Sequence, residues 1–155
     1  MTALRSCVPF GKMWGMRLDH PYSSLVNEGD YAWTCGQCPL DTSGNVLYAN
    51  DLVAQAKLVA EYIHVSLEDA SFNPSSVVKL VVYYTQIDTD QVLAMLQVIK
   101  QSFAGNALVV PIAVPPFYYE GMMIEVDVYA AKNNQPVTTF TAVSYTHLTL
   151  PTIYS

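Results

Sequence analysis

The residues of this sequence that are best suited to acid–base chemistry lie in the segment 122–130, MMIEVDVYA. Here the carboxylates Glu125 and Asp127 alternate with apolar residues, which predicts a β-strand with one face turned into the protein. A carboxylate held on such a strand can position a water molecule or transfer a proton. Glu125 is therefore a candidate catalytic residue, and the alternative is a strand carboxylate that simply points outward.

A second candidate for chemistry is the C-x-x-C sequence at residues 35–38. Redox chemistry would need its first cysteine at a helix N-terminus, where the helix dipole lowers the pKa of the thiol. A proline and a turn follow instead, which favours two strand-end cysteines. Zinc would need two further ligands, and only Cys7 and His20 lie near in sequence, without paired spacing. We therefore expect no metal and no cofactor.

The elements that must position these residues are predicted by hydrophobic periodicity and by capping signals. They follow the order β-β-α-β-α-β-β, an α+β arrangement with two helices on one face of a mixed sheet. The other sheet face is also apolar in places and has no third helix to cover it, which predicts self-association. The expected elements are a hairpin at 22–37, a helix from Asp51 to about Ala70 capped by Asn50, a strand at 77–85, a helix that follows the capping signal at 88–91 and ends before Gly105, an edge or bulged strand at 106–114 containing Pro111, and a strand at 122–130.

Length and charge restrict the classes of function. A chain of 155 residues, 52% hydrophobic and 13% charged, is typical of one folded domain. Its net charge is −6, and its seven Lys and Arg residues are scattered, which argues against binding to nucleic acids or to anionic membranes. No apolar run is long enough to span a bilayer, and the N-terminus lacks the pattern of a secretory signal. We expect a cytoplasmic protein.

The C-terminal segment differs from the rest, because residues 133–155 contain no charged side chain. The string VSYTHLTLPT at 143–152 resembles the in-frame translation of a sequencing-library adapter. We expect 132–155 to be a non-native or disordered tail and set it aside from the fold. The alternative is a natural polar tail.

Several short motifs, in a fixed order, resemble those of the Rid (YjgF-type) family of imine deaminases. They cover residues 21–130, and each matches a landmark of that family. The matching motifs are Pro21-Tyr22-Ser23, Cys35-Gly36-Gln37 with Pro39-Leu40-Asp41 and Gly44, Gln55-Ala56, Val78-Lys79 with Val82-Tyr83, and the strand from Ile124 to Ala130.

This resemblance implies a chorismate-mutase-like fold that assembles as a homotrimer, with small-molecule clefts between the subunits. It also implies hydrolysis of 2-imino or enamine acids to 2-keto acids and ammonia, without a cofactor. On this basis residues 1–20 are a lead-in, 21–131 form the Rid-like domain, and 132–155 are the tail.

The resemblance also suggests site residues. It assigns Glu125 to water positioning or proton transfer, Tyr22 to the cleft wall, and Gly36 to a close backbone approach to the ligand. Tyr118 lies in an aromatic loop that would border the cleft, although packing at a subunit interface would explain it equally.

The largest departure from the family concerns the arginine of its P-A-R motif, which binds the substrate carboxylate. The corresponding stretch, 106–110, is NALVV, so Val109 and Val110 would line the cleft with aliphatic groups. Loss of a bidentate arginine removes a strong carboxylate contact. Arg17, five residues before Tyr22, is a candidate replacement cation.

Three hypotheses follow from these observations. The first is a deaminase or hydrolase acting on enamine or imine small molecules with altered specificity. The second is a non-catalytic small-molecule-binding trimer with a degenerate cleft. The third is a structural module of a longer polypeptide. Ribonuclease activity, which is sometimes attached to this family, finds no support in the acidic charge or in a catalytic histidine pair.

Overall fold

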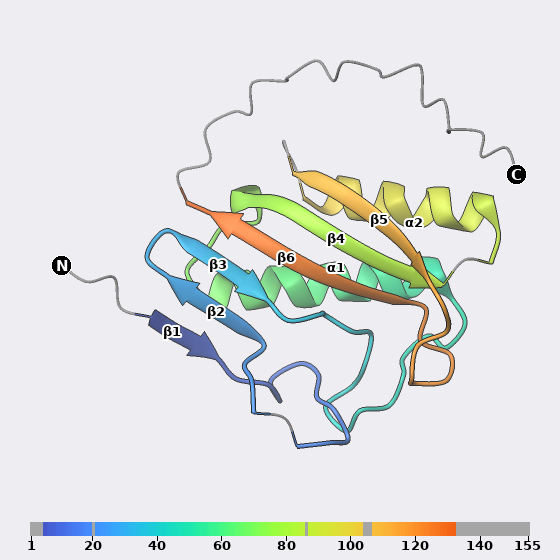
Figure 1. Cartoon of the computed structure of the whole chain (residues 1–155), viewed down its shortest axis with the longest axis horizontal. Coiled ribbons are helices and arrows are strands. Elements are labelled where there is room, and N and C mark those ends of the chain that lie inside the picture. The colour runs from blue at the N-terminus through green and yellow to red at the C-terminus, as the bar shows by residue number, and fades with distance from the viewer. Residues whose placement is uncertain (1–4, 20, 86, 104–106, 133–155) are drawn as a thin grey trace, which may run out of the picture.

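The computed structural model describes residues 5–19, 21–85, 87–103 and 107–132, which form one mixed sheet with two helices packed on one of its faces (Figure 1). Residues 133–155 of the predicted tail, the C′ position of Gly105 and the ligand candidate His20 lie outside the described residues. The elements are β1 (Arg5–Val8), β2 (Leu25–Glu28), β3 (Tyr31–Thr34), α1 (Leu52–Asp69), the 3₁₀ turn η1 (Pro74–Ser76), β4 (Val77–Thr85), α2 (Thr89–Ser102), β5 (Leu108–Val114) and β6 (Ile124–Ala131).

The strand order is β1-β2-β3-β6-β4-β5. Only the β4–β5 pair is parallel among the described strands, as expected for two strands joined through α2. The α+β class and the two-helix arrangement are confirmed. The sheet contains one strand more than predicted. The additional strand is β1, which lies in the predicted lead-in and pairs antiparallel with β2. Its four residues are mostly exposed, so no alternation of apolar and polar residues announced it.

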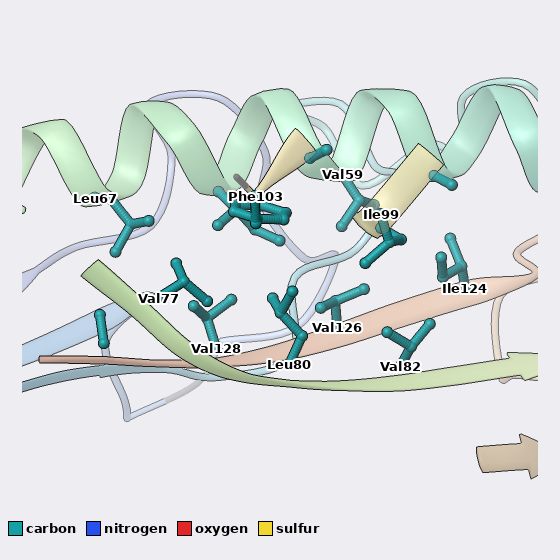
Figure 2. Close-up of a cluster of buried hydrophobic side chains, with 14 of the residues drawn as sticks. Val59, Leu67, Val77, Leu80, Val82, Ile99, Phe103, Ile124, Val126 and Val128 are labelled. Carbon is teal, nitrogen blue, oxygen red and sulfur yellow. The ribbon is translucent and has the colours of Figure 1, made fainter. Parts of the chain in front are cut away.

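The core lies between the sheet and the helices (Figure 2). Alternate residues of β4 and β6 point toward α1 and α2, because successive side chains of a strand face opposite sides. Leu80 and Val82 come from β4, and Ile124, Val126 and Val128 from β6; all five are at most 1% exposed. The helices contribute the predicted apolar positions, including Val59 and Leu67 of α1 and Ile99 of α2.

The capping of α1 differs from the prediction by one residue. Asp51, not Asn50, is the N-cap, and its carboxylate accepts a 2.9 Å hydrogen bond from the Ala54 amide. Asn50 instead adopts a left-handed conformation with φ 64°, which asparagine tolerates better than most residues. Its amide donates to the Gly121 carbonyl at 2.9 Å, so Asn50 ties the start of α1 to the loop before β6.

Strand β5 lies at the edge of the sheet, which confirms the reading of Pro111 as an edge residue. Pro111 lies opposite Val82 of β4, and its missing N–H leaves no inner strand unpaired. The cap of α2 is also as predicted, since the Asp88 carboxylate accepts from the Asp90 amide at 3.0 Å. None of the helices in the described part of the chain is long and apolar enough to cross a membrane.

The sheet face turned away from the helices has no covering layer among the described residues, and it is the face nearer the viewer in Figure 1. Large apolar side chains are exposed there: Trp33 is 37% exposed, Ile112 39%, Tyr129 42% and Leu108 60%. Glu125 and Asp127 lie on the same face, because they alternate with the core residues of β6. We call this surface the open face.

Candidate functional site

A cavity of about 250 Å³ opens where β3 ends and β6 begins. Three parts of the chain form most of its wall: the segment after β3, the loop before β6, and the N-terminal segment before β2. Four predicted site residues, Tyr22, Gly36, Tyr118 and Glu125, are brought together here. The remaining lining residues are Met16, Cys35, Cys38, Leu40, Phe117, Tyr119 and Met122.

The segment after β3 reaches the cavity because it continues to pair with β6 beyond the end of the regular strand. Gln37 and Val126 exchange two backbone hydrogen bonds, of 2.9 and 3.1 Å. This bridge places Gly36 directly against the side chain of Glu125. A Cβ atom at Gly36 would overlap the Glu125 carboxylate, so only glycine leaves the carboxylate in its place.

The side chain of Gln37 holds the segment after β3 in place. It is fully buried, and its Nε2 donates to the Cys35 carbonyl at 3.0 Å and to the Ser24 carbonyl at 3.3 Å. Its Oε1 accepts from the indole Nε1 of Trp14 at 3.2 Å. Every polar atom of the amide is therefore satisfied, as a buried polar group requires. The link to Trp14 makes the predicted lead-in part of the floor beneath the cavity.

A second buried amide, Gln55 of α1, fixes the other wall. Its Nε2 donates to the Gly121 carbonyl at 2.8 Å and to the carbonyls of Leu47 and Tyr48 at 3.2 and 3.1 Å. Its Oε1 accepts from the Met123 amide at 2.8 Å. The helix thus holds the last turn of the loop before β6, which positions Glu125 two residues further on.

Glu125 is a half-buried carboxyl whose pKa is raised above its ordinary value. Burial is the main cause, and the neighbouring Asp127 carboxylate raises the pKa further. The Cys38 thiol donates to Oε2 across 3.7 Å and partly offsets these effects. A carboxyl group with a raised pKa is closer to balance between its charged and neutral forms, which suits proton transfer near neutral pH.

Asp127 lies beside this carboxyl on β6 but is held by other groups. Burial raises its pKa, whereas the Tyr83 hydroxyl, which donates to Oδ2 at 3.3 Å, and the charge of Lys79 lower it. The Lys79 ammonium also lies over the ring of Tyr129, 5.2 Å from its centre. Asp127 is therefore engaged on the open face outside the cavity lining.

The two cysteines of the C-x-x-C sequence lie in the cavity wall as protonated thiols. Burial, followed by the charge of Glu125, raises the pKa of Cys35 to about 12 and that of Cys38 well above its ordinary value. No helix begins at Cys35, since the chain continues through the bridge to β6. This environment opposes thiolate chemistry. Within the described ranges, no cluster of three or more His, Cys, Asp or Glu side chains is arranged to hold a metal ion.

Tyr22 forms the outer rim and is 51% exposed. Its hydroxyl donates to the Met16 sulfur at 3.6 Å, and its ring packs edge-on against Phe10 with centroids 5.7 Å apart. Burial and the nearby Cys35 raise its pKa. Tyr22 therefore contributes a neutral hydroxyl and an aromatic ring to the cavity that Glu125 also lines.

The other predicted site residues lie outside this cavity within one chain. Arg17 lines a neighbouring hollow, where Nη2 donates to Asn45 Oδ1 at 3.1 Å and the guanidinium lies 5.7 Å from the centre of the Tyr119 ring. Val109 and Val110 lie on the edge strand β5, opposite Leu80 and Val81 of β4. Their contribution to a cleft, which requires a second copy of the chain, stays a prediction.

Sequence reasoning missed several residues of the wall. Met16 and Met122 carry no recognisable signal, because methionine occurs equally in cores. Trp14, in the predicted lead-in, is not part of the wall but packs behind it, against Cys38, Leu40 and Met122. The aromatic run at 117–119 was noticed, and two further members of it, Phe117 and Tyr119, line the cavity beside Tyr118. Gln37 and Gln55 belong to the family motifs, but the sequence does not show that their buried side chains hold the backbone of the cavity wall in place.

The fold and the cavity together define a chorismate-mutase-like α+β protein with a pocket of small-molecule size. The family model described as Endoribonuclease L-PSP matches residues 16–132. The chain therefore belongs to this family, which includes the YjgF/Rid proteins.

Curated relatives match over part of their length. The chain is 32% identical over 68 residues to a RutC family protein of Pyrococcus abyssi, which is 44% of this chain and 54% of that protein. A RutC family protein of Pyrococcus horikoshii is 32% identical over 63 residues, or 41% of this chain and 50% of that protein. The chain thus spans about half the length of the curated relatives it matches.

Solved structures match the fold over nearly their whole length. A putative endoribonuclease of Thermotoga maritima superposes with a TM-score of 0.70 at 24% identity, covering 83% of this chain and 98% of that one. TdcF of E. coli, solved with bound serine, superposes with a TM-score of 0.68 at 21% identity, covering 81% and 98%. At these identities the likeness establishes the fold alone.

Proposed function

We propose that this protein hydrolyses the C=N bond of small imines or enamines, with Glu125 as the acid–base group. The observation that carries the proposal is the position of Glu125, a half-buried carboxyl with a raised pKa at the wall of a small cavity. The wall is built from the segments that carry the family motifs, in a chain that belongs to the family. Glu125 is also the only acidic residue among the described lining residues.

The proposed reaction needs no cofactor. Ionised Glu125 accepts a proton from a water molecule as the water oxygen forms a bond to the imine carbon. The carboxyl group then returns this proton to the nitrogen, which gives a neutral carbinolamine. Ionised Glu125 next accepts the hydroxyl proton of the carbinolamine and passes it to the amino nitrogen, so that the C–N bond breaks, the C=O bond forms and ammonia leaves. The neutral hydroxyl of Tyr22, which faces the same cavity, is suited to hydrogen-bond either the water or the departing nitrogen.

We further propose that the chain acts as a homotrimer whose open faces meet. Support comes from the exposed aromatic and aliphatic side chains there, including Trp33, Ile112 and Tyr129, which a single chain leaves in contact with water. In such an assembly Val110, which lies on the open face, would approach the cleft of a neighbouring copy, whereas Val109 packs toward the helices. Sedimentation velocity at micromolar concentration tests this: we expect a trimer, and a monomer would contradict both the assembly and the shared clefts.

A second candidate function is a non-catalytic trimer that binds small molecules. The observation that favours it is the aliphatic stretch of β5, Leu108, Val109 and Val110, where the family resemblance calls for a carboxylate-binding arginine. A protein without that arginine would bind 2-imino acids weakly, since a bidentate charge-assisted contact is lost. Both candidates place a small-molecule ligand in the same cavity, and both place the protein in the cytoplasm. The net charge of −6 supports a small molecule rather than RNA.

An assay with imines generated in situ by an amino-acid oxidase tests the hydrolase. Ammonia release is followed with and without the protein, using imines with and without a carboxylate. We expect acceleration that Glu125→Ala reduces by about a hundredfold or more, the range typical for a general acid–base group. The matched control is Glu68→Gln, which changes an exposed carboxylate on α1 and should leave the rate unchanged.

The outcome separates the two candidates. If the protein does not accelerate hydrolysis of any imine, the hydrolase is excluded and the binding protein is favoured. If Leu108→Arg or Val110→Arg, both on the open face, then confers activity on 2-imino acids, the aliphatic stretch is what separates this chain from a carboxylate-accepting enzyme.

A further inference from the structure

The cavity that the proposed function assigns to the ligand has an unusual combination of charge and surface. Four aromatic rings, those of Tyr22, Phe117, Tyr118 and Tyr119, and two methionine sulfurs, those of Met16 and Met122, contribute to its wall. Among the described lining residues, Glu125 is the only charged one. The wall therefore offers aromatic rings, sulfur atoms and one carboxylate, and its described part offers no cation.

We propose that the ligand of this cavity is a small organic cation: a protonated amine, a quaternary ammonium compound or an iminium ion without a carboxylate. This inference rests on the proposed function for the location of the site and specifies the class of its ligand. The faces of aromatic rings attract cations because their quadrupole is negative above the ring. A carboxylate at the base of such a ring cluster supplies the counter-charge.

The aromatic cluster already receives a cation on one side. The guanidinium of Arg17 lies 5.7 Å from the centre of the Tyr119 ring, on the side of the neighbouring hollow. The Arg17 amide also donates to the Tyr119 hydroxyl at 3.3 Å, which orients the ring. Tyr118 and Tyr119 thus line both the hollow of Arg17 and the cavity that contains Glu125.

Glu125 is left without a basic partner in the described part of the chain. The two salt bridges found there join Arg5 to Glu28 and Lys12 to Asp69, and neither involves the cavity. Cys38 donates weakly to one oxygen of Glu125, and Asp127 adds negative charge nearby. A bound cation would compensate a carboxylate that burial otherwise penalises, whereas a bound carboxylate would add a third negative charge.

Size and overall charge agree with this ligand class. A volume of about 250 Å³ lies below the range of roughly 300–1,000 Å³ that suits drug-sized ligands, so the ligand is a small metabolite. The net charge of −6 raises the local concentration of cations around the protein and lowers that of anions.

Three compounds of nearly equal shape provide the test, because they differ chiefly in charge. They are choline, its neutral carbon isostere 3,3-dimethylbutan-1-ol, and the anion 3,3-dimethylbutanoate. Dissociation constants are measured by calorimetry or by NMR titration of the full-length protein. We expect choline to bind about tenfold or more tightly than the neutral isostere, as cation–π contacts and one carboxylate predict, and the anion to bind most weakly.

Two variants locate the preference at this site. Glu125→Gln keeps the shape and accepts the Cys38 hydrogen bond but loses the charge, so the ratio of choline to isostere affinity should fall to within about threefold. Tyr22→Leu removes one ring from the exposed rim, where folding is little affected, and should weaken choline binding several-fold while changing the isostere less. The control Glu68→Gln should leave all three constants unchanged.

Several outcomes would overturn the inference. They are equal binding of the cation and the neutral isostere, tightest binding of the anion, no binding of choline at millimolar concentration, or a charge preference that survives in Glu125→Gln. Imine hydrolysis is measured on the same preparations. Acceleration without a cation preference removes this inference and keeps the hydrolase, whereas a cation preference without acceleration keeps the inference and removes the hydrolase.

Discussion

The helix-covered face of the sheet and the open face are built from alternate residues of the same strands, yet they differ in the side chains that they carry. Toward the helices, β4 and β6 present mainly aliphatic side chains such as Leu80 and Val126, which pack without polar partners (Figure 2). Toward the open side, the same strands carry Tyr83, Glu125 and Asp127 among exposed aromatic residues. One face is explained by burial within a single chain, and the other is the face that the proposed ligand and further copies of the chain would cover.

The largest expected effect compares two leucines on neighbouring strands. Leu80 is fully buried, and Leu108 on the open face is 60% exposed. Leu80→Ala should lower the free energy of unfolding by about 2–5 kcal/mol, because a cavity remains where the side chain was. Leu108→Ala should cost less than about 1 kcal/mol within one chain. Urea unfolding followed by circular dichroism measures both.

The dependence on protein concentration sharpens this comparison. Any stability lost in Leu108→Ala should vary with concentration, since it would come from association, and the loss in Leu80→Ala should not. Equal, concentration-independent losses in the two variants would show that the open face is part of an ordinary core.

A smaller effect is expected at Gly36, where the open face meets the cavity. Gly36→Ala forces the new Cβ against the Glu125 carboxylate and should lower the free energy of unfolding by about 1–3 kcal/mol, as overpacking typically does. The double variant with Glu125→Ala provides the control, because removal of the carboxylate relieves the overlap. An Ala substitution that costs as much in the double variant as in the single one would argue against this contact.

The contribution of Glu125 to the free energy of unfolding should change with pH by a still smaller amount. The direction of this change should be opposite to that of a carboxylate whose pKa is lowered by folding. Its pKa is raised in the folded state, so the folded protein binds the proton more tightly than the unfolded chain. Stability is therefore highest below the unfolded pKa and falls as pH rises through the folded pKa. Glu125→Gln should stabilise the protein at pH 7 by at most about 1 kcal/mol at this half-buried site, and the gain should vanish below about pH 4. Thermal melts across this pH range would show a gain that persists in acid if the reasoning is wrong.

The smallest effect concerns thiol reactivity, which distinguishes the cavity from the edge of the sheet. Cys7 on β1 is exposed, whereas Cys35 and Cys38 are protonated by burial and by Glu125. A disulfide reagent at pH 8 should modify Cys7 at least about tenfold faster than the other two. In Cys7→Ser the fast phase should disappear, and a fast phase that remains would mean that the cavity thiols are accessible and ionised.

The same contrast explains how far the sequence could be interpreted alone. Strands β4 and β6, helix α2 and the edge position of Pro111 were predicted because each follows from local periodicity or from a property of one residue. Strand β1 was missed, because its four exposed residues gain their structure only by pairing with β2. The predicted N-cap of α1 was wrong by one residue, since the backbone amide of Asn50 donates to the distant Gly121 carbonyl instead.

For the site, the residues that could be named in advance were those carried by the family resemblance or by an aromatic run. Tyr22, Gly36, Tyr118 and Glu125 do lie around one cavity. Methionine and leucine wall residues could not be foreseen, because nothing in their type separates a pocket wall from a core. Their place depends on how the segment before β2 folds back beneath β3 and on the buried contact between Trp14 and Gln37.

The amide of Gln55 has a consequence for how this pocket can change. Its hydrogen bonds join Gly121 and Met123 to Leu47 in the segment before α1. They fix the start of β6 without involving the aromatic side chains at 117–119. We expect substitutions of the side chains at 117–119 to leave the register of β6 unchanged, because none of these side chains takes part in the hydrogen bonds of Gln55. The choice of ligand could therefore change through residues 117–119 while the buried Gln55 keeps β6 in the same position.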